Sequence, residues 1–447
     1  MIKKLLIANR GEIARRIGRT ARRLGIEVVA VYSDADRDAP FVREADLALP
    51  LGPPAPKESY ANVDAMVAAL KKSGADGLHP GYGFLSESEN LVAACLDAGV
   101  TFVGPSVHAM RAMGSKIESK IAMIEAGVPV VPGPVHALEH EDDAVKAAEA
   151  IGWPVMLKAS AGGGGIGMAR CKNEKQLRAA FEDAKKKGEQ FFGSPRVFIE
   201  KLIERPHHVE VQVLGDRHGN VVHLFERECS VQRRNQKVLE ETPSPLLDAD
   251  TRARICDAAV KAARAVRYDN AGTVEFVVDE ARSFYFLEMN TRLQVEHPIT
   301  EAVLGIDLVE HQLRVAAGEV LSLPPLQPRG HAIELRVCAE DPDKRFFPQP
   351  GTLGEVVWPS GEGIRVDAGV ETGSVVPPCY DSLLAKVIAH GATREEAIGR
   401  LRAALDRTSI GGLKSNLEMH KRILDDAEFR AGHTTTSFLE ERLGLKS

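Results

Sequence analysis

The sequence predicts an α/β protein of two or three domains. Its 447 residues are more than a single hydrophobic core normally serves. The first 114 residues alternate short apolar strands with amphipathic helices, a pattern typical of a parallel sheet covered by helices. Strand patterns dominate after about residue 203. We therefore expect a parallel sheet at the N-terminus and a larger, sheet-rich part behind it.

The N-terminal part begins with a strand, a helix and a strand, at 3–9, 11–25 and 27–33. Ile13, Ile17 and Leu24 share one face of this helix. Further alternation follows, with helices at 62–74 and 88–99 and strands at 77–80 and 101–104. The first strand-to-helix turn, "ANRGE", lacks the G-x-G-x-x-G pattern, so we do not expect a dinucleotide site here.

Helical patterns at 115–126 and 138–150 flank "VPVVPGP", which indicates an interdomain hinge. A small unit from Trp153 to about Ile203 follows. Its predicted elements are strands at 154–159, 167–171 and 196–203 and a helix at 173–187. Later strands are expected at 208–216, 221–229, 272–279 and 283–290, with a long helix at about 249–267. From about Gly330 the chain mixes strands with a final helical stretch.

Composition excludes several classes of protein. A net charge of −6 argues against nucleic-acid and membrane partners. The six cysteines form no C-x-x-C pair, which argues against a disulfide framework or a thiolate zinc site. The apolar run near the N-terminus is too short for a signal peptide. We expect a cytoplasmic protein.

The segment "KASAGGGGIGMAR" carries four consecutive glycines, Gly162–Gly165. No helix follows directly, and no Lys-Ser or Lys-Thr follows the glycines, so neither the dinucleotide nor the Walker A pattern is satisfied. A glycine hairpin between two strands could close its backbone N–H groups over nucleotide phosphates beside Lys158. A flexible hairpin tip without chemistry is the alternative.

An acidic hairpin, "GTVEFVVDEARSFYFLEMNTR", favours the phosphate interpretation. A turn centred on Glu280 and Ala281 places Glu275 opposite Phe286, with Glu288 one diagonal step away on the same face. Asn290 lies two residues further on. Such oxygen ligands suit Mg²⁺ that also holds substrate phosphates, although a solvated sheet face remains the alternative.

Two polar segments indicate an anion pocket. Arg233, Arg234 and Lys237 lie within five residues and could clamp a small anion, or could be surface charges. "NTRLQVEH" adds Arg292, Gln294, Glu296 and His297 directly after the acidic strand.

With these motifs in place, the sequence resembles the biotin carboxylases of the ATP-grasp superfamily. The matching segments are "IANRGEIA", "HPGYGFLSE", "MGSK", "GGGGIGM", "HHVEVQV", "ERECSVQRRNQK", "GTVEF", "EMNTRLQVEHPITE" and "PPCYDS". The resemblance implies a Rossmann-like N-terminal domain at 1–114 and an ATP-grasp domain at 115–330. A small mobile glycine-loop lid would occupy about 132–203, and a C-terminal antiparallel-sheet domain 331–447.

The resemblance also implies roles for individual residues. Glu275, Glu288 and Asn290 would hold Mg²⁺ or Mn²⁺. Glu296 would be the general base. Bicarbonate would contact Lys237, Arg292, Gln294 and the backbone of Val295, and Arg336 would face carboxyphosphate and biotin. The nucleotide would contact Lys116, Lys158, Gly162, Gly163, Gly164, Gly165, Glu200, Lys201, Leu202, His208, Gln232 and Gln236.

The implied reaction is ATP- and bicarbonate-dependent carboxylation of biotin through carboxyphosphate. The sequence has no Met-Lys-Met attachment motif, so we expect the biotin on a separate biotin carboxyl carrier protein, with a carboxyltransferase as further partner. The expected setting is an acetyl-CoA or other acyl-CoA carboxylase, as in fatty acid biosynthesis. Alternatives are a urea- or pyruvate-type acceptor, another ATP-grasp carboxylate ligase, and a non-catalytic nucleotide-binding regulator.

Some positions depart from the family pattern. Ile166 stands where Arg or Lys is frequent, and Asn235 where His is usual. At the positions that correspond to the family's dimer contact, Arg19 and Arg365 match, whereas Arg23 and Glu362 do not. A homodimer remains the expectation.

Overall fold

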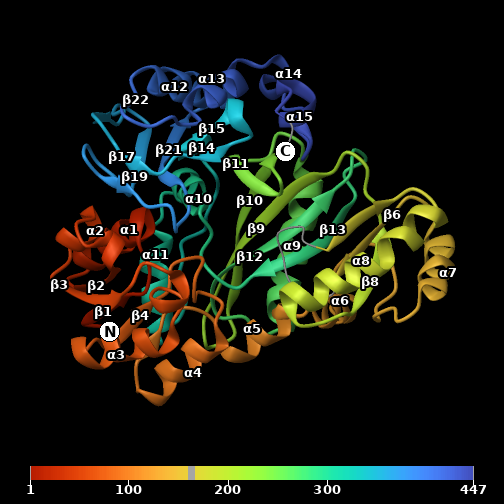
Figure 1. The fold of residues 1–447 in the computed structure, drawn as a ribbon, viewed down its shortest axis with the longest axis horizontal. Helices are drawn as coiled ribbons and strands as arrows, with labels where there is room; N and C mark the ends of the chain where they lie inside the picture. Colours follow the sequence, from red (N-terminus) through yellow and green to blue (C-terminus); the bar gives the residue numbers. More distant parts are fainter. Residues whose placement is uncertain (1, 160–166, 446–447) are drawn as a thin grey trace.

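A computed structural model describes residues 2–159 and 167–445 of the chain. Figure 1 shows the parallel sheet of the N-terminal part in red and orange, and a small yellow unit at the opposite end. A long green sheet connects the middle of the chain to the blue C-terminal part. The four glycines from 162 to 165 lie outside the described residues.

The N-terminal sheet has the order β3-β2-β1-β4-β5, and all its strand pairs are parallel. Its core alternates along β1, because Leu5 and Ile7 pack towards α1 while Leu6 packs towards α3 and α4. Burial on both faces explains the continuous apolar run of the first strand. The prediction of a parallel sheet with helices on both faces is confirmed. The strands are β1 Lys4–Ile7, β2 Glu27–Ser33, β3 Leu47–Gly52, β4 Gly77–His79 and β5 Thr101–Phe102, and the helices α1 Gly11–Arg23, α2 Pro40–Arg43, α3 Val63–Ser73, α4 Glu89–Asp97 and α5 Val107–Gly114.

The small unit has an antiparallel sheet of the order β7-β6-β8. It consists of α7 Glu141–Ile151, β6 Val155–Ala159, β7 Met168–Cys171, α8 Glu174–Phe192 and β8 Val197–Lys201. Its own apolar core includes Leu157, Phe181 and Ile199. Since β6 and β7 pair across the glycine segment and the next helix begins at Glu174, the predicted two strands and following helix are confirmed.

The large sheet is antiparallel, in the order β13-β12-β9-β10-β11-β14-β21-β19. Its strands are β9 His207–Gly215, β10 Val221–Arg233, β11 Gln236–Thr242, β12 Asn270–Val278, β13 Phe284–Asn290, β14 His331–Cys338, β19 Ile364–Ala368 and β21 Leu383–Gly391. Pairing of β11 with β14 carries the sheet across residue 330 without a break. This pairing brings residues of the predicted ATP-grasp domain and of the predicted C-terminal domain into one site.

Strand alternation gives this sheet one apolar face and one buried polar face. Val211 and Val274 point into the core formed with α9, whereas their neighbours Glu210 and Glu275 belong to the opposite face. Both glutamates are nevertheless buried, at 0 % and 4 % exposure. The sequence therefore folds several ionisable groups into the interior, where each needs a partner.

Helices cover the sheet and the C-terminal part. They are α6 Lys116–Glu125, α9 Ala249–Ala265, α10 His297–Leu304, α11 Leu308–Ala316, α12 Arg394–Asp406, α13 Leu417–Asp425, α14 Ala427–Arg430 and α15 Phe438–Leu443. Short strands complete the C-terminal part: β15 Glu340–Asp341, β16 Phe347–Pro348, β17 Gly351–Thr352, β18 Val356–Val357, β20 Val375–Val376 and β22 Ser409–Ile410.

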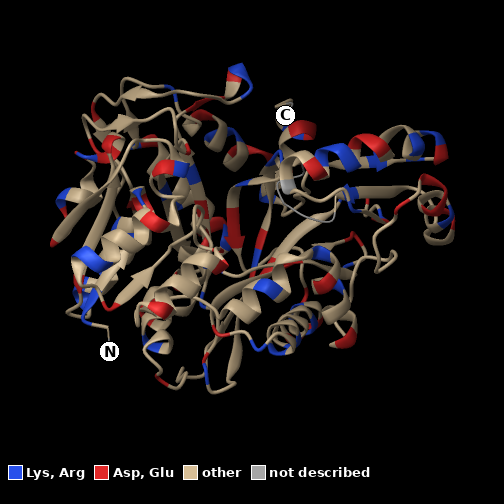
Figure 2. Cartoon of the chain, turned by 60° about the horizontal axis from the view of Figure 1, so that its bottom comes forward, with Lys and Arg blue, Asp and Glu red and all other residues tan. Residues whose placement is uncertain are grey.

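Basic and acidic residues are interspersed over the helices, as Figure 2 shows, and acidic residues also lie on the central strands. Among the described helices, none combines the length and the apolar character that a membrane span requires.

Candidate active site

A cavity of about 930 Å³ lies where the small unit, the large sheet and the N-terminal part meet. Most of the predicted site residues line it. These are Lys116, Lys158, Lys201, Leu202, His208, Gln232, Gln236, Lys237, Glu275, Glu288, Asn290, Arg292, Gln294, Val295 and Arg336. Glu200 and Glu296 lie just behind the wall, and the predicted phosphate loop, Gly162–Gly165, falls outside the described residues.

The register of the acidic hairpin differs from the prediction. Glu275 pairs directly with Glu288, and Thr273 pairs with Asn290, so Glu275 does not lie opposite Phe286. The reason is an odd-numbered connection, residues 279–283, followed by a β-bulge between Glu275 and Phe276. The two carboxylates are therefore direct cross-strand neighbours on one face.

The two carboxylates of this pair differ in their contacts. Both oxygens of Glu275 are engaged: Oε2 is 2.9 Å from His208 Nε2, and Oε1 accepts from Lys237, Asn290 and Gln294 at 2.8 to 3.0 Å. The carboxylate of Glu288 has no hydrogen bond or ion pair with any residue in the described ranges. Burial raises the pKa of Glu288, and the charge of Glu275 raises it further.

A divalent cation fits this arrangement. Two like charges on one buried face repel unless a cation lies near them, and the unpaired carboxylate of Glu288 supplies an unused oxygen ligand. Asn290 adds an amide oxygen at the same end of the hairpin, where it now accepts a hydrogen bond from Arg292 at 2.9 Å.

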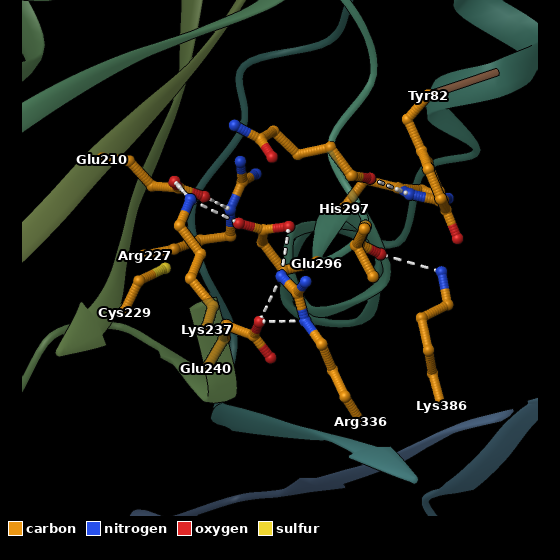
Figure 3. A network of polar contacts seen from close by, with 12 residues as sticks. Tyr82, Glu210, Arg227, Cys229, Lys237, Glu240, Glu296, His297, Arg336 and Lys386 are labelled. Carbon is orange, nitrogen blue, oxygen red and sulfur yellow. Dashed lines mark hydrogen bonds and ion pairs between the residues drawn. The ribbon is translucent and has the colours of Figure 1, made fainter. Parts of the chain in front are cut away.

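Lys237 lies among the carboxylates of the buried polar face, and Figure 3 shows it in contact with Glu210 and Glu296. Its ammonium donates to Glu275 at 2.8 Å and to Glu296 at 2.7 Å, and it also contacts Glu210. Burial alone would lower the pKa of Lys237, but the three carboxylates overcome this and raise it well above its usual value. The lysine therefore stays charged at neutral pH and joins acidic residues of β9, of β12 and of the turn before α10.

Glu296 is fully buried between two cations. Lys237 contacts one carboxylate oxygen, and Arg336 contacts the other at 3.1 Å. Burial acts to raise the pKa of Glu296, yet Lys237, Arg336 and Arg227 hold it well below the usual range. Glu296 is thus an ionised carboxylate at neutral pH, in a position to accept a proton.

Arg336 owes its position to the continuous sheet. It extends from β14 and donates to Glu240 of the adjacent strand β11 at 2.6 Å, as well as to Glu296. Burial raises the pKa of Glu240 to about 7, although Arg336 opposes this shift. Glu240 thereby holds the guanidinium at the cavity wall from behind.

The opposite end of the cavity carries further lysines. Lys158 on β6 lies 2.6 Å from Glu200, and Lys120 on α6 lies 2.9 Å from the same carboxylate. Burial lowers the pKa of Lys116, which also lines this end. The carboxylate of Glu200 is therefore held between Lys158 in the wall and the buried Lys120 behind it, while Lys201 and Leu202 line the cavity itself.

Several residues of the site escaped the sequence analysis. Arg227 is fully buried, donates to Glu210 at 2.6 Å, and contacts Gln212 at 2.8 Å and Thr300 at 3.0 Å. The segment that forms β11 was interpreted as a cluster of charges that could clamp an anion, and no strand was predicted there. A signal was available for Glu210 and Gln212, since polar residues alternate with apolar ones in "HVEVQV", as expected for a strand with one polar face.

These features define a class of protein. A small three-stranded sheet beside a large antiparallel sheet, with lysines, acidic residues and a cavity between them, is the arrangement of the ATP-grasp ligases. The same fold occurs in the biotin carboxylase domain dimer of 2-oxoglutarate carboxylase from Hydrogenobacter thermophilus, solved with MgADP, ADP and bicarbonate. That structure is 44% identical with a TM-score of 0.95, covering 100% of this chain and 98% of the other.

The chain belongs to the biotin carboxylase family. The family model for the biotin carboxylase N-terminal domain matches residues 1–110, that for the carbamoyl-phosphate synthase L chain ATP binding domain residues 115–323, and that for the biotin carboxylase C-terminal domain residues 334–441.

Full-length relatives agree with this assignment. Biotin carboxylase 2 of Bacillus subtilis is 52% identical over 99% of this chain and 100% of its own length. The matching pyruvate carboxylase subunit of Methanothermobacter thermautotrophicus is 49% identical over 99% of this chain and 90% of its own. The activity is accordingly that of a biotin carboxylase, a ligase.

Proposed function

We propose that the chain uses ATP and bicarbonate to carboxylate biotin on a separate carrier protein, through carboxyphosphate. The observation that carries this proposal is the position of Glu296, an ionised buried carboxylate held between Lys237 and Arg336. Bicarbonate is a weak nucleophile until it loses its proton, and Glu296 supplies the acceptor.

Binding of bicarbonate uses the cations and amides around Glu296. Lys237, Arg292 and Gln294 line the cavity together with Val295, whose backbone adds a donor. When Glu296 removes the bicarbonate proton, an oxygen of the resulting dianion attacks the γ-phosphorus of ATP, and ADP leaves. The cations hold the dianion during this transfer and neutralise crowded negative charge.

The ATP phosphates would lie between Lys116 and Lys158, with the glycine segment as their cover. Lys201 and Leu202 would contact the adenine, and His208, Gln232 and Gln236 would complete the nucleotide pocket. Glu275, Glu288 and Asn290 would hold Mg²⁺ or Mn²⁺. This metal supplies charge neutralisation for the phosphates when bound. Arg336 would stabilise negative charge on the ureido group as biotin captures CO₂.

We also propose the division of the chain that these roles require: an N-terminal domain at 1–114, an ATP-grasp domain at 115–330 with a mobile lid at about 132–203, and a C-terminal domain at 331–447. A homodimer in the cytoplasm is the proposed working form. Support for the dimer comes from the Hydrogenobacter relative, and light scattering tests it.

The proposed setting is an acetyl-CoA or other acyl-CoA carboxylase, with a biotin carboxyl carrier protein and a carboxyltransferase as partners. A pyruvate-type acceptor is the second candidate, because the Methanothermobacter relative belongs to a pyruvate carboxylase. Recovery of the biotinylated partner from cell extract, followed by identification of its carboxyltransferase, distinguishes the two.

The activity itself is tested by ADP release. We expect release to require bicarbonate and to rise when free biotin is added. A different ATP-grasp ligase would instead respond to another carboxylate, and a regulator would release no ADP. Glu226→Gln is a suitable control for substitutions at Glu296, because Glu226 is also buried but pairs with Arg252 at 2.6 Å and does not line the cavity.

A further inference from the structure

The turn that leads into α10 is held from behind by two buried side chains. Nδ1 of His297 lies 2.7 Å from the carbonyl oxygen of Gln294. The ammonium of Lys386, on β21, donates to the carbonyl oxygen of Val295 at 2.8 Å. Both side chains are completely buried. Two consecutive carbonyls of this turn thus accept side-chain hydrogen bonds, one from His297 at the end of the turn and one from Lys386 on a distant strand.

The positions of these carbonyls determine where the next two N–H groups point. In a trans peptide the C=O and the N–H lie on opposite sides of the same plane. A fixed Gln294 C=O therefore makes the N–H of Val295 point in the direction opposite to that carbonyl. A fixed Val295 C=O sets the direction of the Glu296 N–H in the same manner. Neither N–H donates a hydrogen bond to any residue that the structure describes, and Val295 lines the cavity.

We propose that His297 and Lys386 are positioning residues that turn the N–H groups of Val295 and Glu296 towards the bicarbonate pocket. This inference rests on the proposed function, because it assigns a purpose to the backbone beside the proposed base. In the view of Figure 3, Lys237 lies to the left of Glu296 and Lys386 to the right, so cations approach this turn from two sides.

The chemistry of both anchors suits a fixed scaffold. A carbonyl oxygen only accepts, so Nδ1 of His297 carries a proton. Burial lowers the pKa of His297, and the nearby cations Lys386, Arg16 and Arg365 lower it well below its usual value, so the ring stays neutral. Lys386 is 3.3 Å from Glu12 and lies opposite Asp367 in the register of β19 and β21, so its charge is compensated.

The anchor also connects two walls of the cavity. Glu12, at the start of α1, accepts a hydrogen bond from Tyr82, which lines the cavity. Lys386 therefore contacts both the turn at Val295 and the carboxylate that holds Tyr82. The pocket backbone is fixed relative to the N-terminal part through one buried ammonium.

Two substitutions at one position test the proposal. In Asn, Nδ2 occupies the place of His Nδ1, so His297→Asn keeps a donor to the Gln294 carbonyl, whereas His297→Leu removes it. We expect His297→Leu to raise the bicarbonate concentration for half-maximal ADP release by about tenfold or more, since an amide donor to an anion is lost. The half-saturating ATP concentration is expected to stay unchanged, and His297→Asn is expected to restore most of the bicarbonate affinity.

His331→Leu serves as the matched control, because His331 is also buried, contacts Glu241 at 2.7 Å and does not line the cavity. It is expected to lower the melting temperature without changing the bicarbonate requirement. If His297→Leu does not fold, the double variant Lys386→Met with Glu12→Gln removes the second anchor without leaving a lone buried charge, and the same selective loss is expected.

The outcomes separate this inference from the proposed function. Wild-type protein without bicarbonate-dependent ADP release would refute the proposed function. Normal wild-type release, combined with an unchanged bicarbonate requirement in a folded His297→Leu or Lys386→Met/Glu12→Gln protein, would overturn the positioning role alone. An equal loss for ATP and bicarbonate would also overturn it, because that result indicates a general structural effect.

Discussion

Replacing Lys237 with Met removes the cation that three buried carboxylates share. The ammonium contacts Glu210, Glu275 and Glu296, and the lysine side chain is only 10% exposed. Removing one partner of a buried ion pair costs about 3–5 kcal/mol, because an uncompensated charge remains. We expect Lys237→Met to lower the free energy of unfolding by about that amount at pH 8.

The pH dependence of this loss has a definite sign. In the wild type, burial acts against the ionised forms, but Lys237 and its neighbours hold the pKa values of Glu275 and Glu296 below their usual range. The stability that these carboxylates contribute is present above the ordinary carboxyl pKa and is lost as the pH falls through the lower folded-state values. Because Glu275 and Glu296 stay ionised over pH 6–8, they add no pH dependence to the stability of the wild type in this range.

Without Lys237, burial dominates and at least one carboxyl pKa rises in the folded state. The folded variant then binds more protons than the unfolded chain, so its stability falls as the pH rises. The slope is about 1.4 kcal/mol per pH unit for each proton bound.

Urea unfolding at pH 6, 7 and 8 measures this slope. A chelator should be present, because His208, Glu210 and Glu275 offer ligand atoms that could hold a metal ion. Lys261→Met is the control, since Lys261 is exposed and pairs with exposed Asp257, at 2.7 Å. The difference in urea midpoint between Lys237→Met and the wild type should grow from pH 6 to pH 8. A difference that is the same at all three pH values would refute the reasoning.

Three further predictions concern single residues. Glu296→Gln is expected to lower bicarbonate-dependent ADP release at least about 100-fold while calorimetric ATP affinity is retained; near-normal turnover would exclude Glu296 as the base. Glu288→Gln removes a buried carboxylate. Because burial raises the pKa of Glu288, its ionised form at pH 8 costs stability, and the metal-free variant should melt at a higher temperature at that pH. The Mg²⁺ concentration for half-maximal activity should rise about tenfold or more. An unchanged Mg²⁺ requirement would contradict this. Gly167→Ala introduces a side chain at φ 73°, 3.1 Å from the Ala159 Cβ, and should destabilise the small unit by about 1–2 kcal/mol. Limited proteolysis measures this effect, and wild-type resistance would count against it.

Much of the fold could be predicted from the sequence, because the periodic spacing of apolar residues is a local pattern. The β1–α1–β2 unit, the small three-stranded unit and the strands β9, β10, β12 and β13 all follow from spacing of apolar residues. The register of the acidic hairpin could not be predicted in this way. A bulge at Glu275 shifts the strand pairing by one residue, and the spacing of apolar residues does not show it. Pairing of β11 with β14 was also beyond local reasoning, because it joins segments about 90 residues apart.

The same limit explains which site residues were found. Glu275, Glu288 and Asn290 lie within one hairpin, so proximity followed from sequence alone. Arg227, Glu240 and Lys386 reach the site from three different strands, and their burial depends on which strands are neighbours. Only the assembled sheet shows that Glu240 supports Arg336 and that Lys386 supports the turn at Val295.

The lowered pKa of Glu296 affects how well this residue can act as the proposed base. A carboxylate whose pKa lies well below its usual range is ionised but weakly basic, so it is ready to accept a proton and poorly able to keep one. Bicarbonate would change this balance, because its negative charge competes for Lys237 and weakens the ion pair with Glu296. Substrate binding would thus raise the basicity of Glu296 when a proton becomes available. It follows that Glu296→Gln should regain part of its activity at alkaline pH, where carbonate in solution needs no base. ADP release measured from neutral to alkaline pH tests this, and a Glu296→Gln protein that remains equally inactive throughout would indicate that Glu296 does more than accept the proton.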